Sequence, residues 1–133
     1  MESWSMIFLD TDVLIDCQRG LPAAAAWLRQ NETTAFAIPG IVAMELVVGC
    51  RDKKDLRITQ TFLKRFTVVW PDAPDMLAAH ELLITYRLAY GVGIPDCLIA
   101  AMMIHRQGQL LTFNVKHYQV FPGLVVRKPY LRD

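Results

Sequence analysis

The alternation of short apolar runs with longer stretches of helical periodicity constrains the fold more than any other feature of this sequence. The apolar runs predict strands over residues 6–9, 34–38, 67–70, 109–112 and 124–126. Helical spacing of apolar residues predicts helices over residues 11–20, 22–31, 41–48, 53–66, 75–90 and 95–107. Strands that alternate with helices are typical of a parallel sheet covered by helices. We therefore expect an α/β fold with a mostly parallel sheet.

The length and composition indicate one well-packed unit. The chain has 133 residues, of which 53% are hydrophobic and 20% are charged, and this is the size and balance of one compact domain. Because no repeat, linker or low-complexity tract interrupts the pattern, we expect a single domain over residues 1–133. The formal net charge is only +1, so any polyanion would have to be bound by a local basic patch.

The cysteines and the apolar runs predict a soluble cytoplasmic protein. Cys17, Cys50 and Cys97 are an odd number, and none lies in a CxxC or other metal-ligand spacing, which favours a reducing compartment. Residues 1–5 are acidic, and only four apolar residues follow before Asp10, unlike a secretory signal. No apolar run approaches the roughly 18 residues that span a bilayer. We expect no membrane partner.

Three acidic residues lie in apolar surroundings on separate predicted elements. Asp10 directly follows the first strand, and the ligand crevice of a parallel sheet lies at the carboxyl ends of its strands. Glu45 is the only charged residue in the stretch 41–48, and Asp96 is likewise the only charged residue in the stretch 94–101. An unpaired buried carboxylate costs on the order of several kcal/mol, which a cation would offset. Oxygen ligands on three elements favour a hard divalent cation.

Each of these acids also has a purely structural explanation. Asp10 or Asp12 would cap the helix that follows. Glu45 would pair with an arginine or lysine, and Asp96 would lie at a helix N-terminus, where the dipole favours a negative charge. It is the set of acids, rather than any one of them, that favours a metal site.

Other signatures of catalysis are missing. The three histidines have no mutual ligand spacing, so zinc is not expected. The sequence contains no GxSxG motif and no Walker loop, and Gly91-Val92-Gly93 lacks the third glycine of a dinucleotide fingerprint.

Four segments, taken in order, resemble the motifs of PIN domains. They are FLDTDVLI (8–15), MEL (44–46), PDCLIAA (95–101) and LTFNVKHY (111–118), the last followed by FPGL (121–124). The final block is similar in particular to VapC toxins, the toxin half of type II toxin–antitoxin (VapBC) systems. The resemblance spans nearly the whole chain, and four motifs in the right order are more specific than any one of them.

The resemblance implies a three-layer α/β/α fold with a five-stranded parallel sheet and a nuclease site. It places metal-binding catalytic acids at Asp10, Glu45 and Asp96, and a fourth catalytic polar residue at Asn114. This fourth position is often aspartate, so asparagine keeps an oxygen but drops a full charge, which puts binding of a second metal in doubt. The resemblance also implies supporting residues around these four, namely Thr11, Asp12 and Thr112.

The implied activity is a Mg²⁺- or Mn²⁺-dependent endoribonuclease that hydrolyses RNA phosphodiester bonds, with a structured RNA such as transfer RNA as substrate. The implied partners are a second copy of the chain and a small VapB-like antitoxin that places apolar residues on the toxin and a basic side chain among its carboxylates. Candidate antitoxin grooves lie around residues 23–28 and 62–66. Candidate RNA contacts are Lys116, His117, Lys54 and Arg57.

Two other classes of function stay open. The LDTDV segment around Asp10 also fits the DxD motif of haloacid dehalogenase-like phosphotransferases, in which the first aspartate is a nucleophile. That interpretation lacks a late paired-aspartate motif and leaves Glu45 unexplained. The second alternative is a PIN-type binding module with weakened catalysis. It is suggested by Asn114, which stands where the family often has aspartate. Cleavage of RNA would separate an enzyme from such a module.

Overall fold

The computed structural model describes residues 6–132, and the acidic segment 1–5 lies outside the described residues. The strands are β1 (Ile7–Leu9), β2 (Phe36–Pro39), β3 (Thr67–Val69), β4 (Gln109–Leu111) and β5 (Val125–Arg127). The helices are α1 (Thr11–Gln18), α2 (Pro22–Gln30), α3 (Gly40–Val48), α4 (Lys53–Leu63), α5 (Ala73–Tyr90), α6 (Ile94–Arg106) and α7 (Val115–Tyr118).

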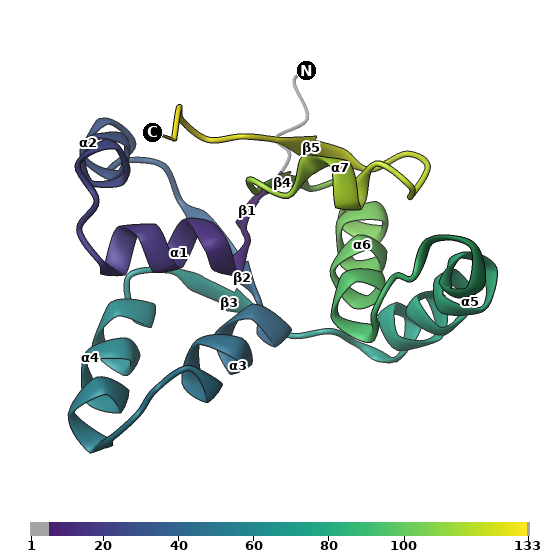
Figure 1. Cartoon of the computed structure of the whole chain (residues 1–133), viewed down its shortest axis with the longest axis horizontal. Helices are drawn as coiled ribbons and strands as arrows, with labels where there is room; N and C mark the ends of the chain where they lie inside the picture. The colour runs from purple at the N-terminus through teal and green to yellow at the C-terminus, as the bar shows by residue number, and fades with distance from the viewer. Residues whose placement is uncertain (1–5, 133) are drawn as a thin grey trace.

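The five strands form one sheet in the order β3-β2-β1-β4-β5, and every neighbouring pair is parallel. Figure 1 shows α1, α2 and α4 on one side of the strands and α5 and α6 on the other. Covering helices on both faces explain why the central strand is entirely apolar, since Phe8 and Leu9 of β1 have no exposed surface. The expected α/β fold with a five-stranded parallel sheet is confirmed.

Helix α6 has the longest buried run in the described chain, because it packs between the sheet and α5. Its residues from Cys97 to Met103 are all buried. Pro95 lies in the first turn, where a missing N–H costs nothing. The preceding helix α5 ends at Gly91, whose φ of 69° is a left-handed conformation suited to glycine. These two signals separate α5 from α6 as the sequence predicted.

The short helix α7 (Val115–Tyr118) was not among the predicted elements. Four residues cannot show helical periodicity, because they complete only about one turn. The other differences lie at boundaries. The fourth helix stops at Leu63 rather than continuing to residue 66, and β2 begins at Phe36 rather than at residue 34.

A buried ion pair joins the start of α5 to the end of α6. Asp75 has no exposed surface, and Arg106 donates to both of its carboxylate oxygens at 2.8 Å, while His105 Nδ1 lies 2.8 Å from Oδ1. Burial alone would raise the pKa of Asp75. The hydrogen bonds from Arg106, the Asp72 backbone and His105 outweigh that effect and hold the pKa well below its usual value.

A second buried carboxylate ties the C-terminal segment to α1. Asp16 accepts a hydrogen bond from the Tyr130 hydroxyl at 2.8 Å and two from Arg132, at 2.8 and 3.1 Å. The same guanidinium lies 4.4 Å from the centre of the Phe113 ring. Burial opposes ionisation of Asp16, but the bonds from Arg132 and Tyr130 prevail and lower its pKa. The segment after β5 therefore crosses the sheet and holds α1 in place.

No helix within residues 6–132 has both the length and the apolar character needed to cross a membrane.

Candidate active site

The predicted acids meet in one pocket at the carboxyl edge of the sheet. The pocket has a volume of about 290 Å³. Its polar lining consists of Asp10, Thr11, Asp12, Glu45, Asp96, Asn114 and Tyr118. These side chains come from the end of β1, from α1, α3 and α6, and from the segment after β4. Residues far apart in the sequence are thus brought together where a parallel sheet opens its ligand crevice.

Asp10 is the buried centre of the pocket and also the N-cap of α1. Its Oδ1 accepts from the Thr11 backbone N–H at 2.8 Å, and its Oδ2 accepts from the Thr112 hydroxyl at 2.9 Å. Burial, followed by the negative charge of Asp12, raises the pKa of Asp10 to about 6, although the two hydrogen bonds act in the other direction. The carboxylate is therefore held rigidly in a place where its charge is poorly compensated.

Glu45 lines the pocket, but the reason given from its sequence neighbours is wrong. The side chain is exposed, because the apolar residues beside it, Met44, Val47 and Val48, are themselves on the surface. Glu45 is therefore not a buried carboxylate, and it does not need a compensating charge for that reason. Glu45 Oε1 instead accepts from the Thr11 hydroxyl at 3.0 Å, which holds the carboxylate toward Asp10.

Asp96 is held by a histidine that was predicted from the sequence as an RNA contact. His117 Nε2 lies 2.8 Å from Asp96 Oδ2, and the same oxygen accepts from the Gly93 backbone N–H at 2.8 Å. His117 therefore orients Asp96, and its contact with RNA stays a prediction. The Gly93 bond belongs to the start of α6, so Asp96 serves its helix terminus and faces the pocket at the same time.

Asp12 and Thr112 fix the segment that follows β4. Asp12 Oδ2 accepts from the Phe113 backbone N–H at 2.9 Å. The buried Thr112 hydroxyl, which donates to Asp10, accepts from the Asn114 backbone N–H at 3.1 Å. These bonds place the exposed Asn114 at the mouth of the pocket. The supporting roles expected for Asp12 and Thr112 therefore have a physical basis.

The remaining predicted residues separate into those near the pocket and those away from it. Lys116 lines an adjoining cavity that shares Asn114 with the carboxylate pocket. Lys54 and Arg57 lie on α4 and do not line the carboxylate pocket.

Tyr118 lines the pocket and was missed by sequence reasoning. It is buried, and its burial, together with the charges of Asp10 and Asp96, raises the pKa of its phenol far above the usual value. The hydroxyl therefore stays protonated and can only act as a neutral donor or acceptor. No sequence signal marks it, since α7 itself was not predicted.

The donor set fits a hard divalent cation. Four carboxylates line the pocket, and no lysine or arginine among residues 6–132 forms an ion pair with any of them. The oxygens of Asp10, Glu45 and Asp96 do not form a set in which all lie within 4.8 Å of one another. A cation bound here would therefore keep water between itself and at least one of these carboxylates, as Mg²⁺ commonly does. Asp10, with its raised pKa, would gain most from the positive charge.

A tighter acidic cluster elsewhere is structural. Ligand atoms of Asp72, Asp75 and His105 all lie within 4.8 Å of one another. The position of a cation there is already taken by Arg106, which binds both oxygens of Asp75. This cluster joins α5 to α6 and has no need of a metal.

Comparisons with known proteins identify the family of the chain. The sequence profile of the PIN domain matches residues 7–121. Ribonuclease VapC19 of Mycobacterium tuberculosis (strain ATCC 25618 / H37Rv) is 35% identical over 130 residues, which cover 94% of this chain and 100% of that protein. A toxin–antitoxin complex from Klebsiella pneumoniae contains a chain that is 28% identical, with a TM-score of 0.73 over 96% of this chain and 100% of that one. The VapBC2 structure from Rickettsia felis, bound to a promoter DNA fragment, has the same fold, with a TM-score of 0.76, 24% identity and coverage of 92% and 98%. The chain therefore belongs to the PIN-domain family.

Proposed function

We propose that this protein is a Mg²⁺- or Mn²⁺-dependent endoribonuclease, that residues 1–133 act as one PIN domain, and that it is the toxin of a toxin–antitoxin pair. The observation that carries the proposal is the meeting of Asp10, Glu45 and Asp96 in one pocket with Asn114 at its mouth. The family membership and the relative named as a ribonuclease supply the reaction class. No observation favours the phosphotransferase alternative.

In this proposal Asp10, Glu45 and Asp96 hold the cation, and the surrounding bonds keep them in place. When bound, the ion lowers the pKa of a water molecule and offsets negative charge on the scissile phosphate. Thr112 fixes Asp10, His117 fixes Asp96 and Thr11 holds Glu45, so each of the three carboxylates has an orienting partner. Fixed ligands lower the cost of reorganisation during the reaction.

The reaction is in-line hydrolysis of a phosphodiester. Water attacks phosphorus, the bond to the 3′-oxygen breaks, and the products are a 5′-phosphate and a 3′-hydroxyl. Asn114 offers an amide at the pocket mouth without adding another negative charge beside the substrate's phosphate. Tyr118, held protonated, lines the pocket without adding a further negative charge to it.

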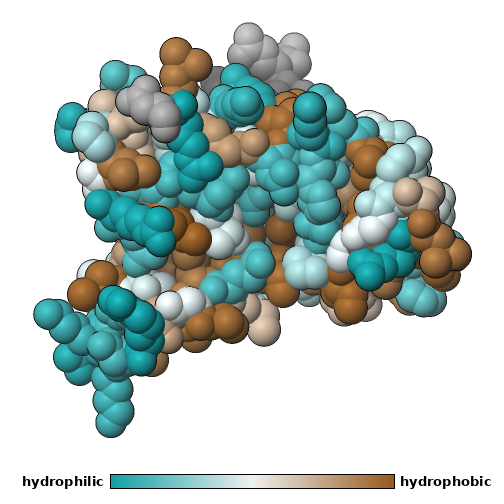
Figure 2. All heavy atoms as spheres, in the orientation of Figure 1, coloured by the Kyte–Doolittle hydropathy of each residue, from teal (hydrophilic) through white to brown (hydrophobic). Residues whose placement is uncertain are grey.

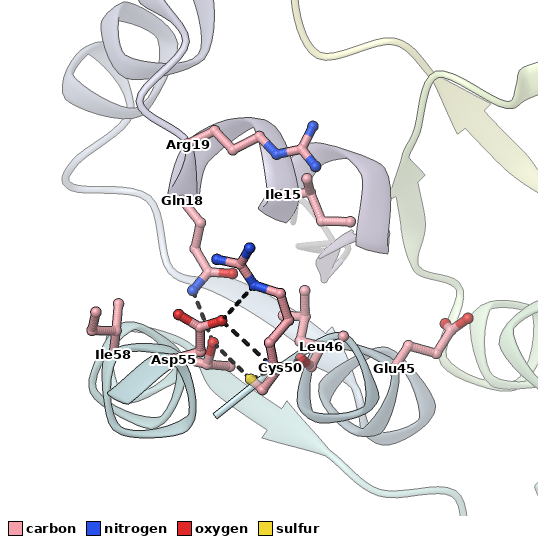
Figure 3. Close-up of a pocket in the computed structure, with 11 residues that line it drawn as sticks. Ile15, Gln18, Arg19, Glu45, Leu46, Cys50, Asp55 and Ile58 are labelled. Carbon is pink, nitrogen blue, oxygen red and sulfur yellow. Dashed lines mark hydrogen bonds and ion pairs between the residues drawn. The ribbon is translucent and has the colours of Figure 1, made fainter. Parts of the chain in front are cut away.

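A larger pocket beside the site suits an antitoxin segment. It has a volume of about 660 Å³ and lies between α1, α3 and α4, where Figure 2 shows a hollow at the left of the molecule. Ile15 and Leu46 give it apolar walls, and Figure 3 shows Glu45 at one end with its carboxylate turned away from Cys50 and Asp55. A segment with apolar side chains would lie in this groove and extend a basic side chain past Glu45. The groove is lined by neither of the stretches 23–28 and 62–66 suggested from sequence.

The test is cleavage of a structured RNA, such as a transfer RNA, by the purified protein with Mg²⁺ or Mn²⁺. We expect cleavage that stops when the metal is chelated and returns when the metal is restored in excess. The Asp10→Asn variant, prepared in the same way, excludes a contaminating nuclease. Undiminished cleavage in excess chelator would contradict the metal mechanism. A wild-type protein that binds RNA without cutting it under any metal would instead identify a binding module.

A further inference from the structure

A cavity lined by unpaired cations adjoins the carboxylate pocket. It has a volume of about 620 Å³. Its walls are Phe113, Asn114, Val115, Lys116, Arg127 and Lys128. The lining therefore carries three positive charges and no negative one. Figure 1 shows two elements that contribute to it, α7 and β5, next to each other beside the end of β4.

The basic cavity begins where the carboxylate pocket ends. Asn114 lines both. Thr112 also connects them through hydrogen bonds, because its hydroxyl donates to Asp10 Oδ2 at 2.9 Å while its backbone N–H donates to the Arg127 carbonyl at 3.0 Å. The parallel register of β4 and β5 thus places Arg127 beside the residue that holds the central acid. A chain leaving the carboxylate pocket past Asn114 enters the cavity directly.

The three cations are free to bind an anion. Lys116, Arg127 and Lys128 are exposed, and none takes part in an ion pair within the described part of the chain. Their charges are therefore not already neutralised by the protein. Three adjacent cations on an otherwise nearly neutral molecule make a local positive patch.

The groove on the opposite side of the carboxylates has no such excess. It contains the cations Arg19 and Arg51, but also the anions Glu45 and Asp55, so its charges balance. Arg51 is moreover bound to Asp55 at 3.1 Å, a contact drawn in Figure 3. The two sides of the active site thus differ in charge, and a polyanion is attracted to only one of them.

We infer that the cavity formed by Lys116, Arg127 and Lys128 binds backbone phosphates of the RNA strand on one side of the scissile bond. The inference rests on the proposed function. A pocket of four carboxylates repels a polyanion, so affinity for RNA must come from cations nearby. Phosphate contacts hold the strand in register across the carboxylates without reading its sequence. Arg127 and Lys128, which sequence reasoning missed, supply two of the three charges.

The test is binding of a fluorescently labelled single-stranded RNA in chelator, where no cleavage interferes, over a series of salt concentrations. We compare wild type with the double variant Arg127→Gln/Lys128→Gln, which removes both positive charges and keeps a polar side chain at each position. We expect the variant to bind roughly tenfold more weakly. The slope of log affinity against log salt should fall by about 1.4, because each phosphate contact to a single strand contributes about 0.7. Two RNAs of unrelated sequence should show the same loss.

A matched control removes two other exposed cations, Arg29 and Lys53, which line neither the basic cavity nor the carboxylate pocket. The Arg29→Gln/Lys53→Gln variant should bind RNA within about twofold of wild type, since the loss depends on position rather than on net charge. Circular dichroism and thermal melting confirm that all variants fold.

The outcomes separate the inference from the proposed function. If wild type cleaves RNA but the Arg127/Lys128 variant binds with unchanged affinity and salt slope, the inference is overturned and the nuclease assignment stands. An equal loss in the Arg29/Lys53 variant would overturn it as well, because the effect would then be one of net charge. If wild type neither binds nor cleaves RNA, the proposed function and this inference both fall.

Discussion

At the scale of single residues, the active-site acids show that a structural role and a chemical role are compatible. Asp10 caps α1 with one oxygen and is bound by Thr112 through the other, and each carboxylate oxygen still has a second lone pair for a cation. Asp96 likewise serves the start of α6 and faces the pocket. The alternatives posed by the sequence, a cap or a ligand, were therefore not exclusive.

Asp96→Asn separates these two roles. Asparagine keeps an oxygen for the Gly93 N–H and has nearly the same shape, so the melting temperature without metal should stay within about 2 °C of wild type or rise as acidic repulsion is relieved. RNA cleavage with metal should fall on the order of a hundredfold or more, since even the partners of metal ligands cost 10–100-fold when removed.

The control for this change is Asp52→Asn, which alters another helix-capping aspartate. Asp52 caps α4 by accepting from the Asp55 N–H, and it lies outside the carboxylate pocket. The Asp52→Asn change should therefore leave RNA cleavage unchanged. Wild-type cleavage by a folded Asp96→Asn protein would remove Asp96 from the proposed ligand set.

At the scale of secondary-structure elements, the sequence predicted the strands and longer helices, which have a periodic apolar pattern. It did not predict features that depend on contacts between distant residues. All five strands and the six longer helices were predicted because each carries its own apolar pattern or stop signal, such as Gly91 after α5. Helix α7 is too short for a pattern, and with it the pairing of His117 with Asp96 was missed. The exposure of Glu45 was mistaken because apolar neighbours on a helix do not reveal whether that helix surface is covered.

The junction of β2 with α3 depends on a glycine. A Cβ at Gly40 would clash with the ring of Trp70, whereas one at Gly49, at the other end of α3, would meet only ordinary contacts of 3.6 Å or more. We expect Gly40→Ala to lower stability by about 1 kcal/mol, because overpacking outweighs the gain in helix propensity.

Gly49→Ala is the matched control and should be close to neutral. Denaturant unfolding measures the stability of both variants. A change in tryptophan emission relative to wild type and Gly49→Ala reports displacement of the Trp70 ring, because the other two tryptophans are common to all three proteins. An unchanged emission spectrum and unchanged stability in Gly40→Ala would contradict the close packing of Gly40 against Trp70.

The α5–α6 junction should give the protein a specific sensitivity to acid. The pKa of Asp75 is lower in the folded protein than its ordinary value of 3.8, so its contribution to stability is complete above that value and is lost as the pH falls through the folded pKa. Thermal melting between pH 5 and pH 2 should show this loss in wild type, beginning as the pH falls below 3.8.

Asp75→Asn tests this assignment, because it removes the titrating group. It should cost about 3 kcal/mol at pH 7, since Arg106 loses its buried partner, and its further loss on acidification should be smaller than that of wild type. Asp55→Asn, which breaks the exposed pair with Arg51, should hardly change the melting temperature. Equal acid sensitivity in wild type and Asp75→Asn would contradict the assignment.

At the scale of the whole molecule, one exposed apolar face lies away from the charged pockets. The carboxylates and cations lie along the carboxyl edge of the sheet, whereas Leu77, Ile84 and Leu88 expose 69%, 61% and 99% of their surface on α5. Figure 2 shows hydrophobic side chains at the right edge of the molecule, over this helix. The three leucine and isoleucine positions recur at helical spacing and share one face. Such a face is typical of a protein–protein contact.

The homodimer implied by the family resemblance gives this face a measurable consequence. Sedimentation equilibrium at micromolar concentration should give twice the mass of 15.1 kDa for wild type. The double change Ile84→Glu/Leu88→Glu should give the mass of a monomer, because charges on the shared face cannot be buried in the contact. Leu131→Glu, which alters an equally exposed residue in the C-terminal segment, should remain dimeric. A wild type that is monomeric throughout would contradict the homodimer.

The pairing of β1 with β4 has a consequence for the order of events during synthesis. Asp10 and the threonine that holds it, Thr112, are 102 residues apart, and β1 lacks one of its two neighbouring strands until β4 has been made. At about 5–20 residues per second, a ribosome needs several seconds to cover that separation. During this interval the nascent chain contains Asp10 without the Thr112 hydroxyl that orients it. The ion pair between Arg132 and Asp16 forms later still. The proposed nuclease site therefore remains incomplete until β4 and the segment that follows it have been made.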